Sequence, residues 1–178
     1  MVDSRNAARV RLRGVRVDAG NVLGVLDRGS DLLDPLLDRG AAALSAEMLG
    51  GTEEAFDRTV AYLKTRKQYG VPIGSFQALK HRAAWMFCEI ALTRSIVAEA
   101  LRALDAGRDD AATLASAAKA RASDTYVLVT NEAVQMHGGV GVTDELDIGF
   151  FMKRARVCEG TFGSASYHRA RFATLRGF

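Results

Sequence analysis

A carboxylate beside a glycine stands near the carboxyl end of the chain, in the run Cys158-Glu159-Gly160-Thr161-Phe162-Gly163-Ser164. Glutamate followed by glycine and threonine is suited to proton abstraction, because a glycine turn can present the carboxylate to a ligand. The run can also be divided three residues later, and Phe162-Gly163-Ser164 then takes the same three places. A phenylalanine ring accepts no proton, so the division decides whether this segment carries a catalytic base.

A cationic corner is predicted between two helices, in the run Arg66-Lys67-Gln68-Tyr69-Gly70-Val71-Pro72-Ile73-Gly74-Ser75-Phe76-Gln77. Guanidinium and ammonium groups at such a corner suit a pyrophosphate. Gln77 lies near the start of the second helix, whose free backbone amides attract anions. On residue chemistry alone, an ordinary polar turn is the alternative interpretation.

Three glycines end a predicted helix in the run Gln135-Met136-His137-Gly138-Gly139-Val140-Gly141. Backbone without side chains can approach a ligand closely. The run is not a P-loop, because no Gly-Lys-Ser/Thr follows, and it is not a Rossmann fingerprint, because no strand precedes it. A glycine helix stop is the alternative, and His137 is as consistent with a capping or packing role as with an acid or base.

One compact domain is expected to position these segments. The chain has 178 residues, 48% of them hydrophobic, and a formal charge of only +3, which does not by itself imply a polyanionic partner. The basic excess lies in 1–16 and 153–178, whereas the middle of the chain is acidic on balance. Cys88 and Cys158 show no metal-ligand spacing, so neither a disulfide frame nor a metal site is expected, and Cys88 is predicted to be a small core residue. The absence of a long apolar run predicts a cytoplasmic chain without a membrane span.

Hydrophobic periodicity predicts an all-α fold, an antiparallel up-down helical bundle. The expected helices span roughly 34–68, 75–106, 110–137, 144–157 and 163–176. Asp34 is the expected cap of the first helix and Ser75 that of the second. A stripe of small residues from Ala115 to Met136 predicts close helix packing, and the glycine pair Gly50-Gly51 predicts either close packing or a bend.

A single strand is predicted before the helices, because residues 10–17 alternate between polar and apolar types, with Gly14 as a bulge. One strand cannot satisfy its own hydrogen-bonding edges. Either a partner chain completes the sheet, or this segment is the tail of a longer protein.

The order and spacing of the two motifs resemble the carboxyl-terminal helical domain of the flavin-dependent acyl-CoA dehydrogenases. The resemblance covers about residues 9–177. It assigns 1–33 to the end of that family's middle β-domain with its linker, and 34–178 to the helical bundle domain. It implies a homo- or heterotetramer with this bundle at its core, FAD bound between subunits and an acyl-CoA substrate, with no nucleic-acid or membrane partner.

The same resemblance implies which residues contact the cofactor. Arg66, Lys67 and Gln68 would face the flavin pyrophosphate of the neighbouring subunit, and the run from Gln135 to Gly139 would hold the adenosine side. The implied cofactor-binding residues are Arg66, Lys67, Gln68, Phe76, Gln77, Gln135, Met136, His137, Gly138, Gly139 and Ser164.

The resemblance also bears on the catalytic base, which in this family removes the proton α to the thioester while flavin N5 takes a hydride from the β carbon. The base commonly lies in a Glu-Gly-Thr motif. Aligning Arg154-Ala155-Arg156 and Arg169 with the usual neighbours of that motif requires no gap, and it puts Phe162 in the glutamate place. Ser164 then takes the place of the threonine, whose hydroxyl contacts the cofactor.

Some relatives instead carry the glutamate near the start of the first long helix, and the resemblance puts Gly40 in that place and Ala41 in the place of the neighbouring substrate-binding arginine. Both usual positions therefore lack a carboxylate, and the chain most resembles the non-catalytic small subunits of bacterial heterotetrameric acyl-CoA dehydrogenases. Two alternatives stay open: an active homomeric dehydrogenase that uses Glu159, and a flavin-free truncated module that binds a partner or nucleic acid through its basic ends.

Overall fold

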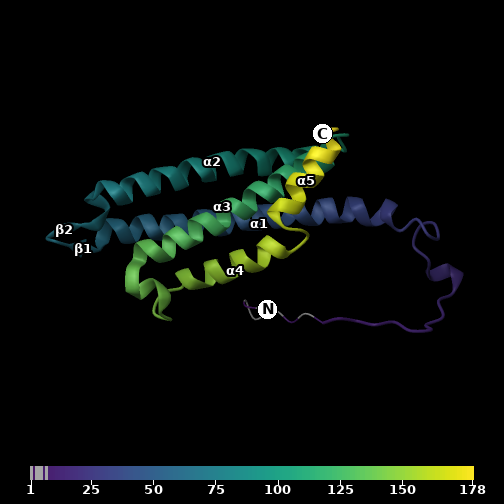
Figure 1. Ribbon diagram of the computed structural model, residues 1–178, viewed down its shortest axis with the longest axis horizontal. Helices are drawn as coiled ribbons and strands as arrows, with labels where there is room; N and C mark the ends of the chain where they lie inside the picture. Colours follow the sequence, from purple (N-terminus) through teal and green to yellow (C-terminus); the bar gives the residue numbers. More distant parts are fainter. Residues whose placement is uncertain (1, 3–5, 7) are drawn as a thin grey trace.

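A computed structural model describes residue 2, residue 6 and residues 8–178 of the chain. It is an elongated antiparallel helical bundle in which α1 and α2 run nearly the whole length and α5 crosses one end (Figure 1). The elements are η1 (Ala19–Asn21), α1 (Ser30–Thr65), β1 (Lys67–Gln68), β2 (Val71–Pro72), η2 (Ile73–Ser75), α2 (Gln77–Asp105), α3 (Ala111–His137), η3 (Gly138–Val142), α4 (Ile148–Gly160) and α5 (Ala165–Leu175). The predicted all-α bundle is confirmed.

Helix α3 lies at the centre and contacts α1, α2, α4 and α5. Its predicted stripe of small residues is buried, which brings the neighbouring backbones close: Ala115, Ala118, Ala122, Thr125, Val129, Ala133 and Met136. One close approach is at Gly51 on α1, where an added Cβ would lie 2.5 Å from the Tyr126 hydroxyl oxygen of α3. Close packing therefore explains Gly51, whereas Gly50 faces open space.

Three predicted details of the helices are wrong. Helix α1 begins at Ser30, so Asp34 is not its cap and Pro35 lies inside the helix. Ser75 does not cap α2, because its hydroxyl donates to the Pro72 carbonyl (2.7 Å) within the turn η2 and the helix starts two residues later. Cys88 is exposed rather than buried, because it lies on the outward side of α2.

The segment before α1 forms an arm outside the bundle (Figure 1). Residues 8–18 form no ladder with any other described residue and their side chains are exposed, so the predicted strand at 10–17 has no partner within this chain and its pairing stays a prediction. A segment without a neighbouring strand leaves its backbone N–H and C=O groups without hydrogen-bonding partners in the protein, as expected for a single strand. The division at 33/34 stays a prediction; residues 1, 3–5 and 7 of the predicted segment 1–33 lie outside the described residues.

Candidate functional site

The cationic corner between α1 and α2 is a small antiparallel hairpin. Strand β1 pairs with β2 so that Lys67 faces Pro72 and Gln68 faces Val71. The turn between them is made by Tyr69 and Gly70, both with positive φ (54° and 80°), the pattern of the two-residue turns that join tight hairpins. This geometry presents the corner as a tip beyond the helices.

The basic groups of that hairpin are accessible. Arg66, Lys67 and Gln68 are exposed, and within the described residues neither Arg66 nor Lys67 pairs with a carboxylate. Phe76 and Gln77 follow at the start of α2, where Phe76 contacts the Tyr69 ring edge-on at 6.2 Å between centroids. Two cations without local counter-ions beside a helix start can attract a phosphate-bearing ligand.

Tyr62 joins this corner to the glycine run. Its carbonyl accepts the backbone N–H of Arg66 at 2.9 Å, and its hydroxyl donates to the His137 carbonyl at 3.3 Å. The Tyr62 and His137 rings also contact each other, with 4.4 Å between centroids. The two predicted motifs therefore lie at the same end of the bundle (Figure 1). Sequence reasoning missed Tyr62, because a tyrosine within a helical stripe carries no signal beyond packing.

The glycine run presents backbone more than side chains. Gln135, Gly138 and Gly139 are exposed, whereas the Met136 side chain packs in the core. His137 is also buried, and its Nδ1 lies 2.7 Å from the Ala133 carbonyl oxygen. Since a carbonyl can only accept, Nδ1 carries the hydrogen, and in the neutral ring Nε2 is left as an acceptor.

A cavity of about 330 Å³ opens beside this junction, between α1 and the start of α4. It is lined by Arg58, Ala61, Tyr62, Thr65, His137, Leu146, Asp147 and Ile148. Aromatic, cationic and hydroxyl groups together can hold a polar planar ligand.

The segment 158–164, in which the sequence leaves the position of a catalytic carboxylate open, lies at the C-terminal end of α4. This helix has 13 residues and is therefore about 20 Å long. Glu159 lies on the last turn of α4, where its carboxylate pairs with Arg156 one turn earlier at 3.2 Å. Phe162 follows in the loop, with a φ of 58° that side-chain-bearing residues rarely adopt. Its ring rests on Gly40 of α1, where an added Cβ would lie 3.2 Å from the ring.

Two separate sequence positions thus meet at one point. Gly40 and Phe162, the two places in which the family resemblance expects a carboxylate, lie in contact, and neither side chain can accept a proton. Ala41 beside them is buried. Ser164 caps α5: its hydroxyl accepts the Tyr167 backbone N–H at 3.3 Å and lies 2.9 Å from the Ser166 hydroxyl.

A buried ion pair anchors α5 to α1 just behind this loop. The Arg171 guanidinium donates to both Asp38 carboxylate oxygens, at 2.5 and 3.1 Å, and to the Ser116 hydroxyl at 2.8 Å. The hydrogen bond to Asp38 raises the pKa of Arg171 above its ordinary value. The guanidinium therefore stays cationic, and its contacts tie α1, α3 and α5 together.

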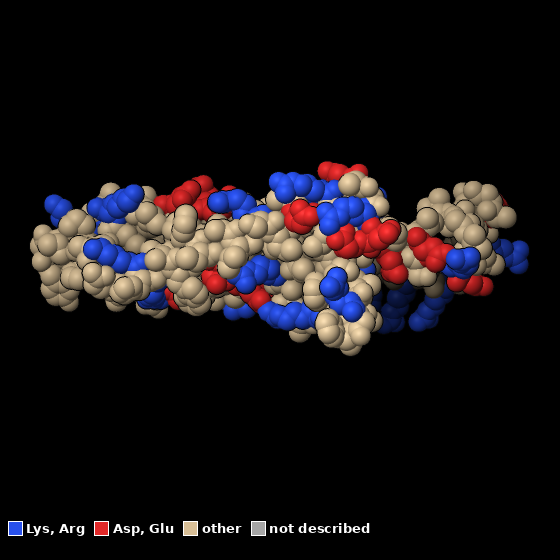
Figure 2. Space-filling model, turned by 90° about the horizontal axis from the view of Figure 1, so that it is seen from above, with Lys and Arg blue, Asp and Glu red and all other residues tan. Residues whose placement is uncertain are grey.

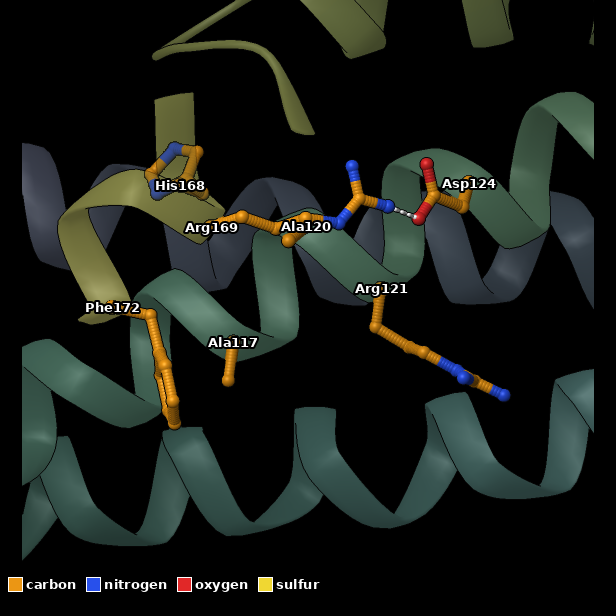
Figure 3. A pocket seen from close by; sticks show the side chains of 7 residues that line it. All are labelled: Ala117, Ala120, Arg121, Asp124, His168, Arg169 and Phe172. Carbon is orange, nitrogen blue, oxygen red and sulfur yellow. Dashed lines mark hydrogen bonds and ion pairs between the residues drawn. The ribbon is translucent and has the colours of Figure 1, made fainter. Parts of the chain in front are cut away.

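A second cavity, of about 300 Å³, lies between α3 and α5. Figure 3 shows Arg169 extending from α5 to an ion pair with Asp124 on α3, with Phe172 and Ala117 on the other side of the opening. The arginine that aligns with the family motif is thus engaged with a neighbouring carboxylate.

Charges on the face that carries α2 are mixed. Figure 2 shows lysine and arginine side chains next to aspartate and glutamate side chains along this face. Ion pairs of α2 and the turn after it include Arg94 with Glu53 and Arg108 with Glu99. The basic excess therefore does not form a continuous basic surface on this side. Among the described residues, no group of three His, Cys, Asp or Glu side chains is placed to bind a metal. Over the same residues, every helix is too short or too polar to cross a membrane.

Comparison with known proteins identifies the fold's relatives. The family model for the acyl-CoA dehydrogenase C-terminal domain matches residues 27–174. Acyl-CoA dehydrogenase IpdE2 of Mycolicibacterium smegmatis is 42% identical over 120 residues, which cover 67% of this chain and 37% of the relative. Probable acyl-CoA dehydrogenase YngJ of Bacillus subtilis is 35% identical over 168 residues, which cover 94% and 44%.

Solved structures of acyl-CoA dehydrogenases share this fold. Butyryl-CoA dehydrogenase from Megasphaera elsdenii superposes with a TM-score of 0.86 at 31% identity, over 90% of this chain and 42% of that one. The structure named "Tcur3481-Tcur3483 steroid ACAD G363A variant" gives 0.76 at 34% identity, over 80% and 39%. This chain spans about two fifths of the length of such relatives. It belongs to the acyl-CoA dehydrogenase family, whose carboxyl-terminal helical domain it matches.

Proposed function

We propose that this chain works as part of an FAD-dependent acyl-CoA dehydrogenase, in which it helps to bind FAD across a subunit interface but supplies no catalytic base. The reaction is α,β-desaturation of an acyl-CoA thioester. The observation that carries this proposal is the contact between the Phe162 ring and Gly40. By the family resemblance, Phe162 and Gly40 take the two alternative places of the base, and neither residue can accept a proton.

The exposed groups at the hairpin end fit a dinucleotide with a charged pyrophosphate. Arg66 and Lys67 offer cations without local counter-ions, and Gly138, with a φ of 67°, leaves backbone that a ligand can approach closely. Gln135 offers an amide beside it. FAD, when bound, supplies the acceptor for the hydride that leaves the substrate. Phe76 and Gln77 would complete the pyrophosphate side, and His137 and Gly139 the adenosine side.

Ser164 is the proposed hydroxyl contact to the cofactor at the other end of α4. Its oxygen already accepts one hydrogen bond, but a hydroxyl has a second lone pair and can also donate. Met136 would contribute only its backbone, because its side chain lies in the core.

The missing proton acceptor is expected to come from a partner subunit. A positioned general base contributes about 10²–10⁴ in rate, so a chain with phenylalanine at that point should be nearly inert alone. Glu159 is not expected to replace it, because its carboxylate is turned to Arg156 along α4. The partner is thus a second acyl-CoA dehydrogenase subunit in a heterotetramer, and the cytoplasm stays the predicted location.

The test is FAD retention by the chain co-expressed with a second acyl-CoA dehydrogenase subunit. Flavin absorbance per mole of purified complex is measured for the wild type, for Arg66→Gln and for Lys64→Gln, an exposed cation on the last turn of α1 that serves as the matched control. Arg66→Gln should weaken FAD binding roughly 10- to 100-fold, because it removes a charge-assisted hydrogen bond to phosphate. Equal retention in the two variants would remove Arg66 from the cofactor site.

A further inference from the structure

The loop that carries Phe162 has a backbone that needs external support. Phe162 has a φ of 58° and Gly163 a φ of 107°. A residue with a side chain rarely adopts the left-handed conformation, and such positions persist only where surrounding contacts hold them. An added Cβ at Gly163 would lie 2.5 Å from the Tyr167 ring, so the loop is also closely packed against α5.

Lys119 of α3 provides one of these supports. Its side chain is fully buried, and the ammonium donates to the Gly163 carbonyl (3.0 Å), the Glu159 carbonyl (3.3 Å) and the Ser123 hydroxyl (3.1 Å). Its three donors are thus matched by three uncharged oxygens. Two of these oxygens belong to the backbone on either side of Phe162.

His168 of α5 provides the other support. It is 2% exposed, and its Nε2 lies 2.9 Å from the Phe162 carbonyl oxygen. The carbonyl can only accept, so Nε2 carries the hydrogen and donates. Three backbone carbonyls in five residues, at 159, 162 and 163, are therefore held by two buried side chains that come from different helices.

Burying these two groups carries an energetic cost. Burial lowers the pKa of Lys119 to about 8 and also lowers the pKa of His168 below its ordinary value. A buried amine is normally retained where it pairs with a carboxylate, but here its three acceptors are neutral. Lys119 and His168 instead donate to backbone carbonyl groups in and beside the loop 161–164.

We infer that Lys119 and His168 are positioning residues, which fix the backbone of loop 161–164 so that the side chain at position 162 stands against Gly40. The meaning of this for catalysis rests on the proposed function, since that contact is the point at which a base would otherwise stand. The geometric claim itself can be tested without a cofactor or substrate.

The alternative is that Lys119 serves only as a stop for α4 and contributes to overall stability. The two roles predict different structures for the loop after the Lys119 ammonium is removed. A positioning role requires the Phe162–Gly40 contact and the left-handed backbone to be lost while the bundle stays folded. A purely structural role leaves both intact in any variant that folds.

Nuclear Overhauser effects in the isotope-labelled chain measure these features directly. The wild type should show a strong intraresidue HN–Hα effect at Phe162, which is diagnostic of positive φ, and effects between the Phe162 ring and Gly40. Lys119→Met keeps the length and removes the donors; it should lose both signals while those within α2 persist. Lys80→Met, an exposed lysine on α2, is the matched control and should change neither.

Retention of both signals in folded Lys119→Met would overturn the inference, as would their absence from the wild type. If Lys119→Met does not fold, His168→Leu, which removes one donor only, is read in the same way. Flavin retention in the co-expressed complex is a separate measurement. Its failure would refute the proposed function and leave the result on the loop standing.

Discussion

The buried pair of Asp38 and Arg171 should be a principal energetic link between α1 and α5. The Asp38 side chain is 10% exposed, and its two carboxylate oxygens accept hydrogen bonds of 2.5 and 3.1 Å from the guanidinium. Arg171→Met leaves this carboxylate buried without its partner. Removing one member of such a pair costs 3–5 kcal/mol, and the lower end, about 3 kcal/mol, is expected because the Arg171 side chain is 23% exposed.

The assay is urea unfolding at pH 7 followed by helical circular dichroism. For a chain of this size, a loss of about 3 kcal/mol in the free energy of unfolding corresponds to a fall of about 6–12 °C in Tm, which thermal unfolding of the same variant measures. Arg94→Met is the matched control, because the side chains of Arg94 and its partner Glu53 are more exposed (57% and 36%) than those of Arg171 and Asp38, and exposed pairs contribute little.

The double variant Asp38→Leu with Arg171→Met provides the decisive comparison. Replacing both members by apolar groups leaves no buried charge, so most of the lost stability should return. An Arg171→Met variant as stable as Arg94→Met would refute the reasoning, as would a double variant that sums two independent losses.

Three further predictions concern single residues. Burial lowers the pKa of Lys119 to about 8 from an ordinary 10.5, so between these pH values the unfolded chain binds a proton that the folded chain does not. The free energy of unfolding, measured with urea, should therefore rise from pH 8 to 9.5. Lys119→Met should flatten this rise. Gly51→Ala should destabilise the bundle by roughly 1–3 kcal/mol, because its Cβ would overlap the Tyr126 hydroxyl, whereas Gly50→Ala should be neutral or stabilising by about 1 kcal/mol; equal melting temperatures would contradict this. Glu159→Gln in the co-expressed complex should leave acyl-CoA turnover unchanged, and lost turnover in a complex that keeps its flavin would make Glu159 the base.

The periodic part of the fold was predictable from the sequence, because buried positions repeat at the helical period. The stripe from Ala115 to Met136 and the close packing at Gly51 follow from residue size alone. Buried hydroxyls were not predictable, since Thr52 and Thr59 are polar residues. They are buried because each hydroxyl donates to the carbonyl four residues earlier, at 2.6 and 2.7 Å.

The ends of elements were harder to predict. Asp34-Pro35 has the composition of a helix start, yet α1 continues upstream to Ser30 and holds Pro35 in its second turn, although proline is disfavoured inside a helix. Cys88 lies in a stretch with many apolar residues, but its side of α2 faces outward. The orientation of a helix in the bundle is a tertiary property that one helical pattern leaves undetermined.

The sequence predicted the cationic corner and the glycine run as two separate motifs, but it did not predict that they lie together. Their spacing pointed to a cofactor, while their junction through Tyr62 depends on the crossing of α1 and α3. The contact between Gly40 and Phe162 joins residues more than a hundred positions apart, and only the folded chain brings them together. Lys119 and His168 gave no signal, because a lysine among alanines and a lone histidine are ordinary in sequence.

The response of bound flavin to an acyl-CoA substrate tests most directly whether this chain lacks its own catalytic base. Flavin absorbance is recorded anaerobically for this chain alone with added FAD, and for the chain co-expressed with a second dehydrogenase subunit. We predict tight FAD binding and bleaching of the flavin by substrate only in the complex. Stoichiometric FAD on this chain alone, bleached by acyl-CoA, would contradict it.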